Sequence, residues 1–147
     1  MLNDNKKLQV YRFSGYWRDV GTLASLHEAN MDIALDGREF DLYDGNRSLT
    51  IYTEDTYSVP QYIGPNGSIK RSIANQGALI LGSVDTCVIS SNVVIEEGAS
   101  CYKCVIMEGA KVKKGAKVEN AIIAPNSVIK ANSEVNLGTN EVILISK

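Results

Sequence analysis

CVISSNVVIEEGASCYK (87–103), CVIMEGAKVKKGAKVEN (104–120) and AIIAPNSVIKANSEVNL (121–137) are three consecutive copies of one 17-residue repeat. The third, ninth and fifteenth residues of each copy are aliphatic or thiol side chains: Ile89, Ile95, Cys101; Ile106, Val112, Val118; Ile123, Ile129, Val135. Two residues before each of these stands a smaller side chain: Cys87, Val93, Ala99; Cys104, Ala110, Ala116; Ala121, Ser127, Ser133. Spacing by two puts both members of a pair on one face of an extended strand. Each copy therefore predicts three short strands with their apolar side chains facing inward.

The turn positions of the repeat support this interpretation. Residues that tolerate a positive φ recur at two corners: Asn92, Gly109 and Asn126 at one, and Gly98, Gly115 and Asn132 at the other. A shorter copy fits at 72–86, with Ile80 and Val84 inward and Gly82 as the small residue, and its shorter length predicts a clipped corner. Such self-similarity predicts a mainly β protein whose core is a three-sided parallel β-helix. The spacing leaves the handedness of the coil open.

Composition limits the classes of partner. The chain has 147 residues, 44% of them hydrophobic and 22% charged, and its net charge is −2. We therefore expect neither a nucleic-acid partner nor a membrane partner. The three cysteines all lie in the repeat, and an odd number of them favours a reducing, cytoplasmic location.

The rest of the chain predicts other elements. Apolar residues between 8 and 13 predict a strand, YWRDVGT (16–22) a loop ending in the helix cap Thr22, and 23–37 a helix ended by Gly37. Leu23, Leu26, Asn30, Ile33 and Ala34 are expected to share one mainly apolar face of this helix. Residues 48–53 predict a short strand, 57–70 a linker rich in proline and glycine, and 141–147 a closing strand.

These elements predict three segments. Residues 1–37 are too few to bury a core, and we interpret this strand, loop and helix as the C-terminal remnant of another domain. Residues 38–71 are then a linker with a short strand, and residues 72–147 the β-helix domain.

Residue types exclude two kinds of β-helix enzyme. Acyltransferases of this architecture need a general-base histidine, and carbonic anhydrases need three histidines for zinc. The single histidine, His27, lies on the predicted helix, where it is expected to pack between domains or lie on the surface. Cys101 and Cys104 match C-x-x-C, but both occupy slots that Val, Ala or Cys fill in other copies, so we interpret them as core residues.

Two groups of residues are candidates for binding. Lys111, Lys113, Lys114 and Lys117 form a basic run, which is either a solvated face or an anion site for a phosphorylated effector. In YWRDVGT, Asp19 can bind a divalent cation and Trp17 can lie against a sugar ring, while the alternative is a capped turn in which Asp19 accepts hydrogen bonds from backbone amides.

YRFSGYWRDVGTLASLHEANMDIAL (11–35), LTIYT (49–53), a proline-bearing linker and the repeat together resemble the glucose-1-phosphate adenylyltransferase family. The resemblance runs from about Tyr11 onward and corresponds to the C-terminal third of that family's polypeptide. It implies a left-handed β-helix that supports assembly, as a homo- or hetero-oligomer and a tetramer in this family, and allosteric regulation. It also implies an N-terminal nucleotidyltransferase domain that makes ADP-glucose and pyrophosphate from ATP and glucose 1-phosphate, for glycogen biosynthesis.

The resemblance also assigns roles to residues. It implies that Asp19 is a Mg²⁺ ligand and that Trp17 and Arg18 lie at the glucose 1-phosphate site of the intact enzyme. The Gly-rich nucleotide loop of the family is absent from this sequence, so no complete catalytic set is present. We therefore expect the chain by itself to be inactive and to bind no cofactor. The alternatives are the same domain of another sugar-nucleotide transferase, or a free-standing solenoid that serves binding or oligomerisation.

Overall fold

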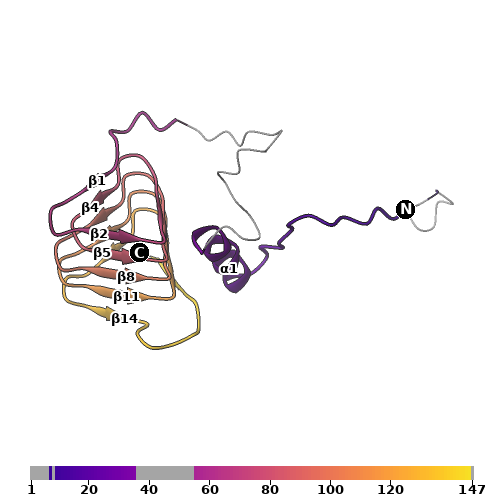
Figure 1. The fold of residues 1–147 in the computed structure, drawn as a ribbon. Coiled ribbons are helices and arrows are strands. Elements are labelled where there is room, and N and C mark those ends of the chain that lie inside the picture. Colours follow the sequence, from indigo (N-terminus) through magenta and orange to yellow (C-terminus); the bar gives the residue numbers. More distant parts are fainter. Residues whose placement is uncertain (1–6, 8, 36–54, 147) are drawn as a thin grey trace.

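The computed structural model describes residue 7, residues 9–35 and residues 55–146. Three five-stranded parallel sheets form a three-sided solenoid, and the helix α1 (Leu23–Ala34) lies beside it (Figure 1). This confirms the predicted mainly β solenoid. The predicted strand at 48–53 and the predicted helix-ending Gly37 lie outside the described residues.

Each sheet is one face of the prism. Face A contains β1 (Tyr62–Ile63), β4 (Leu79–Ile80), β7 (Val94–Ile95), β10 (Lys111–Val112) and β13 (Val128–Ile129). Face B contains β2 (Ser68–Lys70), β5 (Ser83–Asp85), β8 (Ser100–Tyr102), β11 (Lys117–Glu119) and β14 (Glu134–Val135). Face C contains β3 (Ile73–Ala74), β6 (Val88–Ile89), β9 (Val105–Ile106), β12 (Ala121–Ile123) and β15 (Ile143–Ile145), the last of which is the predicted closing strand. We call one strand from each face, taken in chain order, a rung.

The core lies inside the prism and consists of the ladders that the repeat predicts. Val118 pairs with Cys101 on one side and Val135 on the other, and Ile123 pairs with Ile106. Apart from the half-buried Val135 and Ser133 of the last copy, the predicted inward residues and their smaller partners are all at most 3% exposed. Because neighbouring rungs repeat the same side-chain sizes, each large residue lies over another large one and each small residue over a small one.

The corners show why glycine and asparagine recur. All six predicted corner residues have φ between 56° and 69°. A third corner, between faces B and C, also has positive φ, at Arg71, Thr86, Lys103 and Asn120. The repeat did not reveal this corner, because arginine, threonine and lysine rarely adopt such a backbone conformation.

The predicted clipped corner is confirmed, and the structure places it at Gly82. Leu79 pairs with Val94, 15 residues later, whereas Val94 pairs with Lys111, 17 residues later. The shortened corner draws the backbone inward, so that a Cβ on Gly82 would stand 2.3 Å from the carbonyl oxygen of Ala99. Only glycine fits this close approach.

The solenoid begins earlier than residue 72. β1 pairs with β4 and β2 pairs with β5, so residues 62–70, predicted as part of a linker, form the first rung. Gly64 and Gly67 lie at its first corner, where the N–H of Gly67 donates to the carbonyl of Gly64 at 2.9 Å. The signals interpreted as a linker are therefore those of a tight corner.

Helix α1 is capped by Thr22 as predicted, but the residues that it buries are not those of the apolar face expected from the sequence. Thr22 and Ser25 exchange hydrogen bonds in a capping box, and Leu35 leaves the helix with an extended backbone. The buried residues are His27, Met31 and Ala34, whereas Leu23 is 43% exposed. The orientation of the helix follows from its contact with face C, where Met31 packs with Val105 and Ile122. It does not follow from the most apolar face of the helix itself.

The strand predicted between residues 8 and 13 is not formed by residues 9–13, and Val10 and Tyr11 are 93% and 86% exposed. A strand needs a partner strand, and none of the described strands pairs with this segment. Among the described residues, no helix is long and apolar enough to cross a membrane.

Candidate functional site

The loop at residues 16–22 is held in one conformation by its own side chains. Asp19 Oδ1 accepts a hydrogen bond from the N–H of Gly21 at 3.1 Å, and Thr22 caps the helix that follows. This bond to a backbone amide is the one that the capped-turn interpretation predicts. The second carboxylate oxygen of Asp19 has no hydrogen-bond partner among the described residues and can accept a ligand.

Helix α1 also holds the start of the loop. Asp32 Oδ2 accepts hydrogen bonds from the hydroxyl of Tyr16 at 3.1 Å and from Nε of Arg18 at 2.9 Å, and Nη1 of Arg18 lies 3.4 Å from Glu28 Oε2. The hydrogen bond and the charge of Asp32 raise the pKa of Arg18 further above its ordinary value. Burial, followed by the bond to Asp32, raises the pKa of the Tyr16 hydroxyl. Arg18 is therefore cationic and Tyr16 is a neutral donor near pH 7.

Trp17, between Tyr16 and Arg18, is largely exposed. Its side chain is 74% exposed while those of Tyr16 and Arg18 contact α1. A flat aromatic surface of this kind can stack against a sugar ring. The loop thus offers an indole face and a carboxylate oxygen within two residues of each other.

Mg²⁺ usually takes one or two protein carboxylates and completes its octahedron with water and substrate phosphates. Asp19 can supply one such ligand. In the described part of the chain, no group of three or more His, Cys, Asp or Glu side chains could hold a metal ion. The residues present therefore fit one ligand of a metal that a phosphate substrate or another domain also binds.

His27 joins α1 to the solenoid. It is 5% exposed, and its Nε2 lies 2.7 Å from the carbonyl oxygen of Lys103, so Nε2 is the donor. The expectation that His27 is a packing residue and not a catalyst agrees with this position, because the ring is buried and its Nε2 is bonded to a backbone carbonyl.

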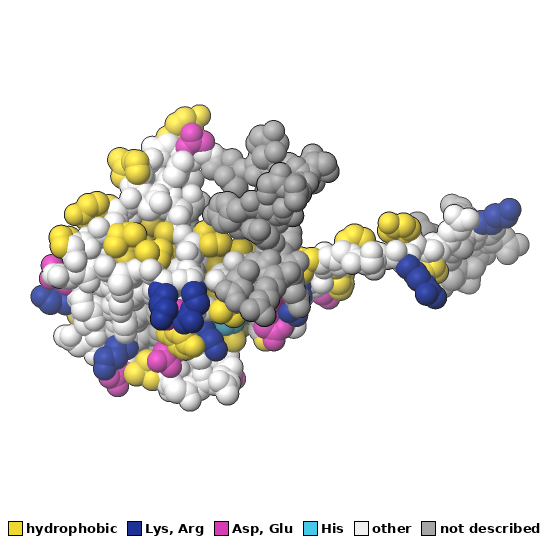
Figure 2. Space-filling view, in the orientation of Figure 1, with side chains coloured by type: hydrophobic (Ala, Val, Ile, Leu, Met, Phe, Trp, Pro, Cys, Tyr) yellow, Lys and Arg dark blue, Asp and Glu magenta, His cyan; other side chains and the backbone are white. Residues whose placement is uncertain are grey.

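The four lysines of the predicted basic run do not converge. Lys111 faces outward from face A and Lys117 from face B, with Lys113 and Lys114 at the corner between them. Three of them pair with acids on neighbouring rungs: Lys113 with Glu96 at 2.6 Å, Lys114 with Glu97 at 3.8 Å, and Lys117 with Glu134 at 2.9 Å. On the side shown in Figure 2, basic and acidic side chains are both scattered over the surface. An effector anion would have to compete with these carboxylates.

Glu96 is the centre of this group of charges. The hydrogen bond from Lys113 and the backbone N–H of Lys114, which donates to Glu96 Oε2 at 2.9 Å, lower the pKa of Glu96. Its carboxylate therefore stays ionised and keeps one lysine bound. This favours the solvated-face interpretation of the run.

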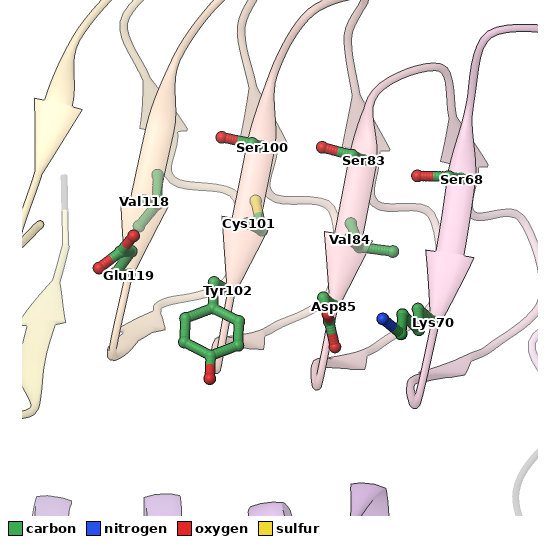
Figure 3. A pocket seen from close by; sticks show the side chains of 10 residues that line it. All are labelled: Ser68, Lys70, Ser83, Val84, Asp85, Ser100, Cys101, Tyr102, Val118 and Glu119. Atoms are coloured by element: carbon green, nitrogen blue, oxygen red, sulfur yellow. The ribbon is translucent and has the colours of Figure 1, made fainter.

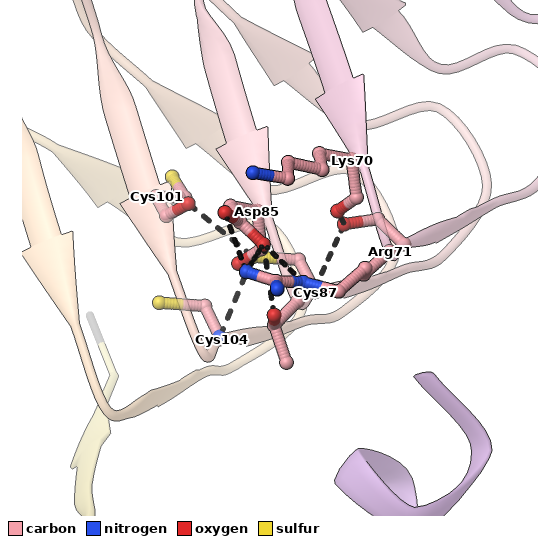
Figure 4. A network of polar contacts seen from close by, with 8 residues as sticks. Lys70, Arg71, Asp85, Cys87, Cys101 and Cys104 are labelled. Carbon is pink, nitrogen blue, oxygen red and sulfur yellow. Dashed lines mark hydrogen bonds and ion pairs between the residues drawn. The ribbon is translucent and has the colours of Figure 1, made fainter. Parts of the chain in front are cut away.

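The cysteines are free and buried. Cys87 and Cys104 occupy one inward ladder, where the Cys104 N–H lies 3.5 Å from Cys87 Sγ (Figure 4). Hydrogen bonding to Cys104 and burial raise the pKa of Cys87 well above its ordinary value, and the bond to Cys101 and burial raise that of Cys104. Thiols that stay protonated in a packed interior are poor nucleophiles and metal ligands, in line with the predicted structural role.

A shallow pocket on face B contains polar residues that the sequence did not indicate. Ser68, Ser83 and Ser100 stand in one outward row, beside a second row that includes Lys70, Asp85 and Tyr102 (Figure 3). Burial opposes ionisation of Asp85, but hydrogen bonds from Arg71, at 2.8 Å, and from Thr86 outweigh it and lower its pKa. The signal in the sequence is the serine that recurs in the first rungs, which the prediction of a linker at 57–70 does not include.

Comparison with known proteins places these observations in a family. A family model described as "GlmU-like, C-terminal hexapeptide" matches residues 58–142. Proteins named glucose-1-phosphate adenylyltransferase from Bacillus mycoides, Bacillus thuringiensis and Bacillus anthracis are each 41% identical to this chain over 114 residues.

The two matches differ in extent. The 114 residues make up 78% of this chain and 30% of each Bacillus protein, so the chain spans less than a third of those relatives. The match to them is longer than the stretch from 58 to 142 that the family model covers, and so it includes residues outside the repeat region.

Proposed function

The chain belongs to the GlmU-like C-terminal hexapeptide family, and from this premise we propose that it is the solenoid-bearing part of a glucose-1-phosphate adenylyltransferase. The observation that carries the proposal is the 41% identity over 114 residues, because that length exceeds the repeat region shared by unrelated transferases. The intact enzyme would join ATP and glucose 1-phosphate to form ADP-glucose and pyrophosphate, for glycogen synthesis. We place it in the cytoplasm, a setting in which its three free cysteines would stay reduced.

Within such an enzyme the loop at 16–22 would meet the sugar phosphate. Trp17 presents its exposed ring to the glucose moiety, and Asp19 offers one oxygen to Mg²⁺. When bound, Mg²⁺ would neutralise charge on the substrate phosphates. Arg18 can join the site through N–H groups not used by Asp32 and Glu28, since a guanidinium has five donors.

The nucleotide pocket would come from an N-terminal catalytic domain, with which this chain pairs. A lone metal ligand and an exposed indole cannot orient ATP for in-line displacement, so the chain alone is proposed to be inactive. The solenoid would serve assembly of a homo- or hetero-oligomer, a tetramer by resemblance, and regulation. The alternative to a solvated face for Lys111, Lys113, Lys114 and Lys117 is an effector site in which an anion displaces the carboxylate partners of Lys113, Lys114 and Lys117.

A chimera tests the proposal. The matching 30% of the Bacillus mycoides enzyme is replaced by this chain, and ADP-glucose formation is measured with ATP, glucose 1-phosphate and Mg²⁺. We expect activity within about tenfold of the parent, because that factor corresponds to only 1.4 kcal/mol of transition-state stabilisation. The chain alone and the truncated parent are expected to form none.

Two further chimeras make a negative result informative. One carries the corresponding segment of the Bacillus anthracis enzyme and serves as a positive control for the junction. The other carries a hexapeptide solenoid from a different sugar-nucleotide transferase. If the chain's chimera is folded but inactive while the Bacillus anthracis chimera works, the proposal is wrong. If the chimera with this chain and the chimera with the other transferase's solenoid are equally active, the repeat is interchangeable and the adenylyltransferase assignment loses its support.

A further inference from the structure

Helix α1 presents two adjacent rows of side chains to two different neighbours. His27 and Met31 are four residues apart and face the solenoid, while Glu28 and Asp32, each one position later, face the loop at 16–22. One position is a rotation of about 100° around a helix, so the two rows lie side by side on the same two turns. A shift of the helix on one side must therefore displace its contacts on the other.

The contact with the solenoid rests on a rigid point. His27 binds the carbonyl oxygen of Lys103, which lies at the corner between β8 and β9. The backbone N–H of Lys103 in turn donates to the backbone carbonyl oxygen of Asp85 on the preceding rung at 3.1 Å. Lys103 has φ of 50°, a conformation that the surrounding rungs impose. Beside it, Met31 packs with Val105 and Ile122 on face C. The hydrogen bond between His27 and Lys103 therefore fixes the position of the helix on face C. Apolar contacts have no preferred direction and would not fix it alone.

The contact with the loop is also directional. Asp32 accepts from both Tyr16 and Arg18, so the two residues that flank Trp17 are bonded to one carboxylate. Arg18, His27, Glu28, Asp32 and Lys103 line one groove, which shows that the loop contact and the solenoid contact lie next to each other.

We propose that His27 is a positioning residue through which the solenoid sets the placement of Trp17 and Asp19. The path runs from the Lys103 carbonyl to His27, along α1 to Asp32, and from Asp32 to Tyr16 and Arg18. The consequence for catalysis rests on the proposed function, since it takes the loop to be the sugar-phosphate site. The mechanical link does not, because every contact in it lies within this chain.

Trp17 reports on the mechanical link, since it is the only tryptophan in the sequence. The full chain is compared with His27→Ala, His27→Gln and Val118→Ala by fluorescence anisotropy. We expect His27→Ala to lower the anisotropy by about one third, because the released loop gains nanosecond motion. His27→Gln keeps a donor at similar reach and should stay close to wild type. Val118→Ala weakens the solenoid core elsewhere and should leave the anisotropy unchanged.

The catalytic consequence is measured in the active chimera. His27→Ala is expected to raise KM for glucose 1-phosphate about tenfold, with KM for ATP and kcat changed less than twofold, since only one substrate's binding surface is displaced. His27→Gln should restore most of the loss. A variant that merely unfolds part of the enzyme would lower kcat and leave both KM values unchanged.

The outcomes separate the two proposals. An inactive wild-type chimera overturns the proposed function, while the anisotropy of the chain still decides the mechanical link. An active chimera in which His27→Ala changes neither anisotropy nor KM for glucose 1-phosphate overturns the role of His27. Equal loss of anisotropy in His27→Ala and Val118→Ala would also overturn the role of His27, because it would show that the loss comes from general destabilisation.

Discussion

Ser127 occupies a slot that the other copies fill with apolar side chains. It follows Val93 and Ala110 in the ladder beside β7 and β10, and its side chain is 1% exposed. Its hydroxyl oxygen has no hydrogen-bond partner among the described residues. Ser133, in the equivalent slot at the next corner, differs because its hydroxyl donates to the carbonyl of Lys130 at 2.7 Å. The same residue type thus has opposite energetic consequences at two equivalent positions.

Ser127→Ala should stabilise the solenoid. Removal of a buried hydroxyl without a partner relieves its desolvation cost, and we expect the free energy of unfolding to rise by about 1 kcal/mol. Urea denaturation followed by far-UV circular dichroism measures the change. Ser133→Ala is the matched control and should be neutral or destabilising, because it removes a made hydrogen bond. A loss of stability in Ser127→Ala would show that the hydroxyl is satisfied in solution.

At the scale of an element, the relation between α1 and β12 matters most. Ile122 and Ile123 are adjacent and both fully buried, but Ile123 faces the interior of the prism and Ile122 faces outward under the helix. Face C is apolar on both sides, whereas face B exposes mostly polar residues on its outer side. The outward residues Val105 and Ile122 of face C form the surface on which the helix packs.

These two isoleucines should fail in different ways. Ile123→Ala opens a cavity in the core and should lower the free energy of unfolding by about 2–5 kcal/mol. Ile122→Ala should instead loosen α1 while the rungs stay intact, because it removes the surface on which Met31 packs. Hydrogen exchange measured separately on residues 23–34 and 111–123 distinguishes the two. Uniform loss of protection in Ile122→Ala would contradict this division.

The sequence could predict the start of α1 but not its buried face. Thr22 and Ser25 act locally, so the cap follows from residues within one turn. The buried face depends on partners 70 to 90 residues away, and no stripe of α1 is apolar enough to decide it alone. His27 in particular can be buried because its ring hydrogen-bonds to the backbone carbonyl of Lys103. Likewise, the roles of Trp17, Arg18 and Asp19 follow from a resemblance, whereas the Arg18–Asp32 contact depends on how the loop folds against α1.

At the scale of the whole molecule, ion pairs between rungs follow the axis of the solenoid. Arg71 pairs with Asp85 on the next rung, and Lys113 pairs with Glu96 on the preceding one. The repeat made the prism predictable because identical slots recur at a fixed spacing. The first rung escaped prediction because its corner residues, Gly64 to Gly67, are also those of a linker.

Acid should weaken the fold through two of these carboxylates. In the folded chain the pKa values of Asp85 and Glu96 lie below their ordinary 3.8 and 4.5. The unfolded chain therefore takes up protons first, and stability present above about pH 5 is lost as the pH falls through those values and then the folded ones. We expect Asp85→Asn combined with Glu96→Gln to flatten the decline of the unfolding free energy between pH 5 and pH 3.

Thermal unfolding across that range measures the slope. Glu108→Gln, which removes an exposed carboxylate outside these ion pairs, is the matched control. A double variant whose slope equals that of wild type would contradict the assignment of acid sensitivity to Asp85 and Glu96.

The constant spacing of the rungs gives the chain a structural reading frame. Duplication or loss of a whole 17-residue unit would change the height of the prism by roughly 4.8 Å and return every later residue to its own face. Loss of one residue within a strand would turn all later inward side chains outward. Length can therefore vary between relatives only in whole steps or at corners. The rung that contains Gly82 spans 15 residues because it is shortened at a corner. The shortening is possible because glycine has no side chain to meet the neighbouring rung.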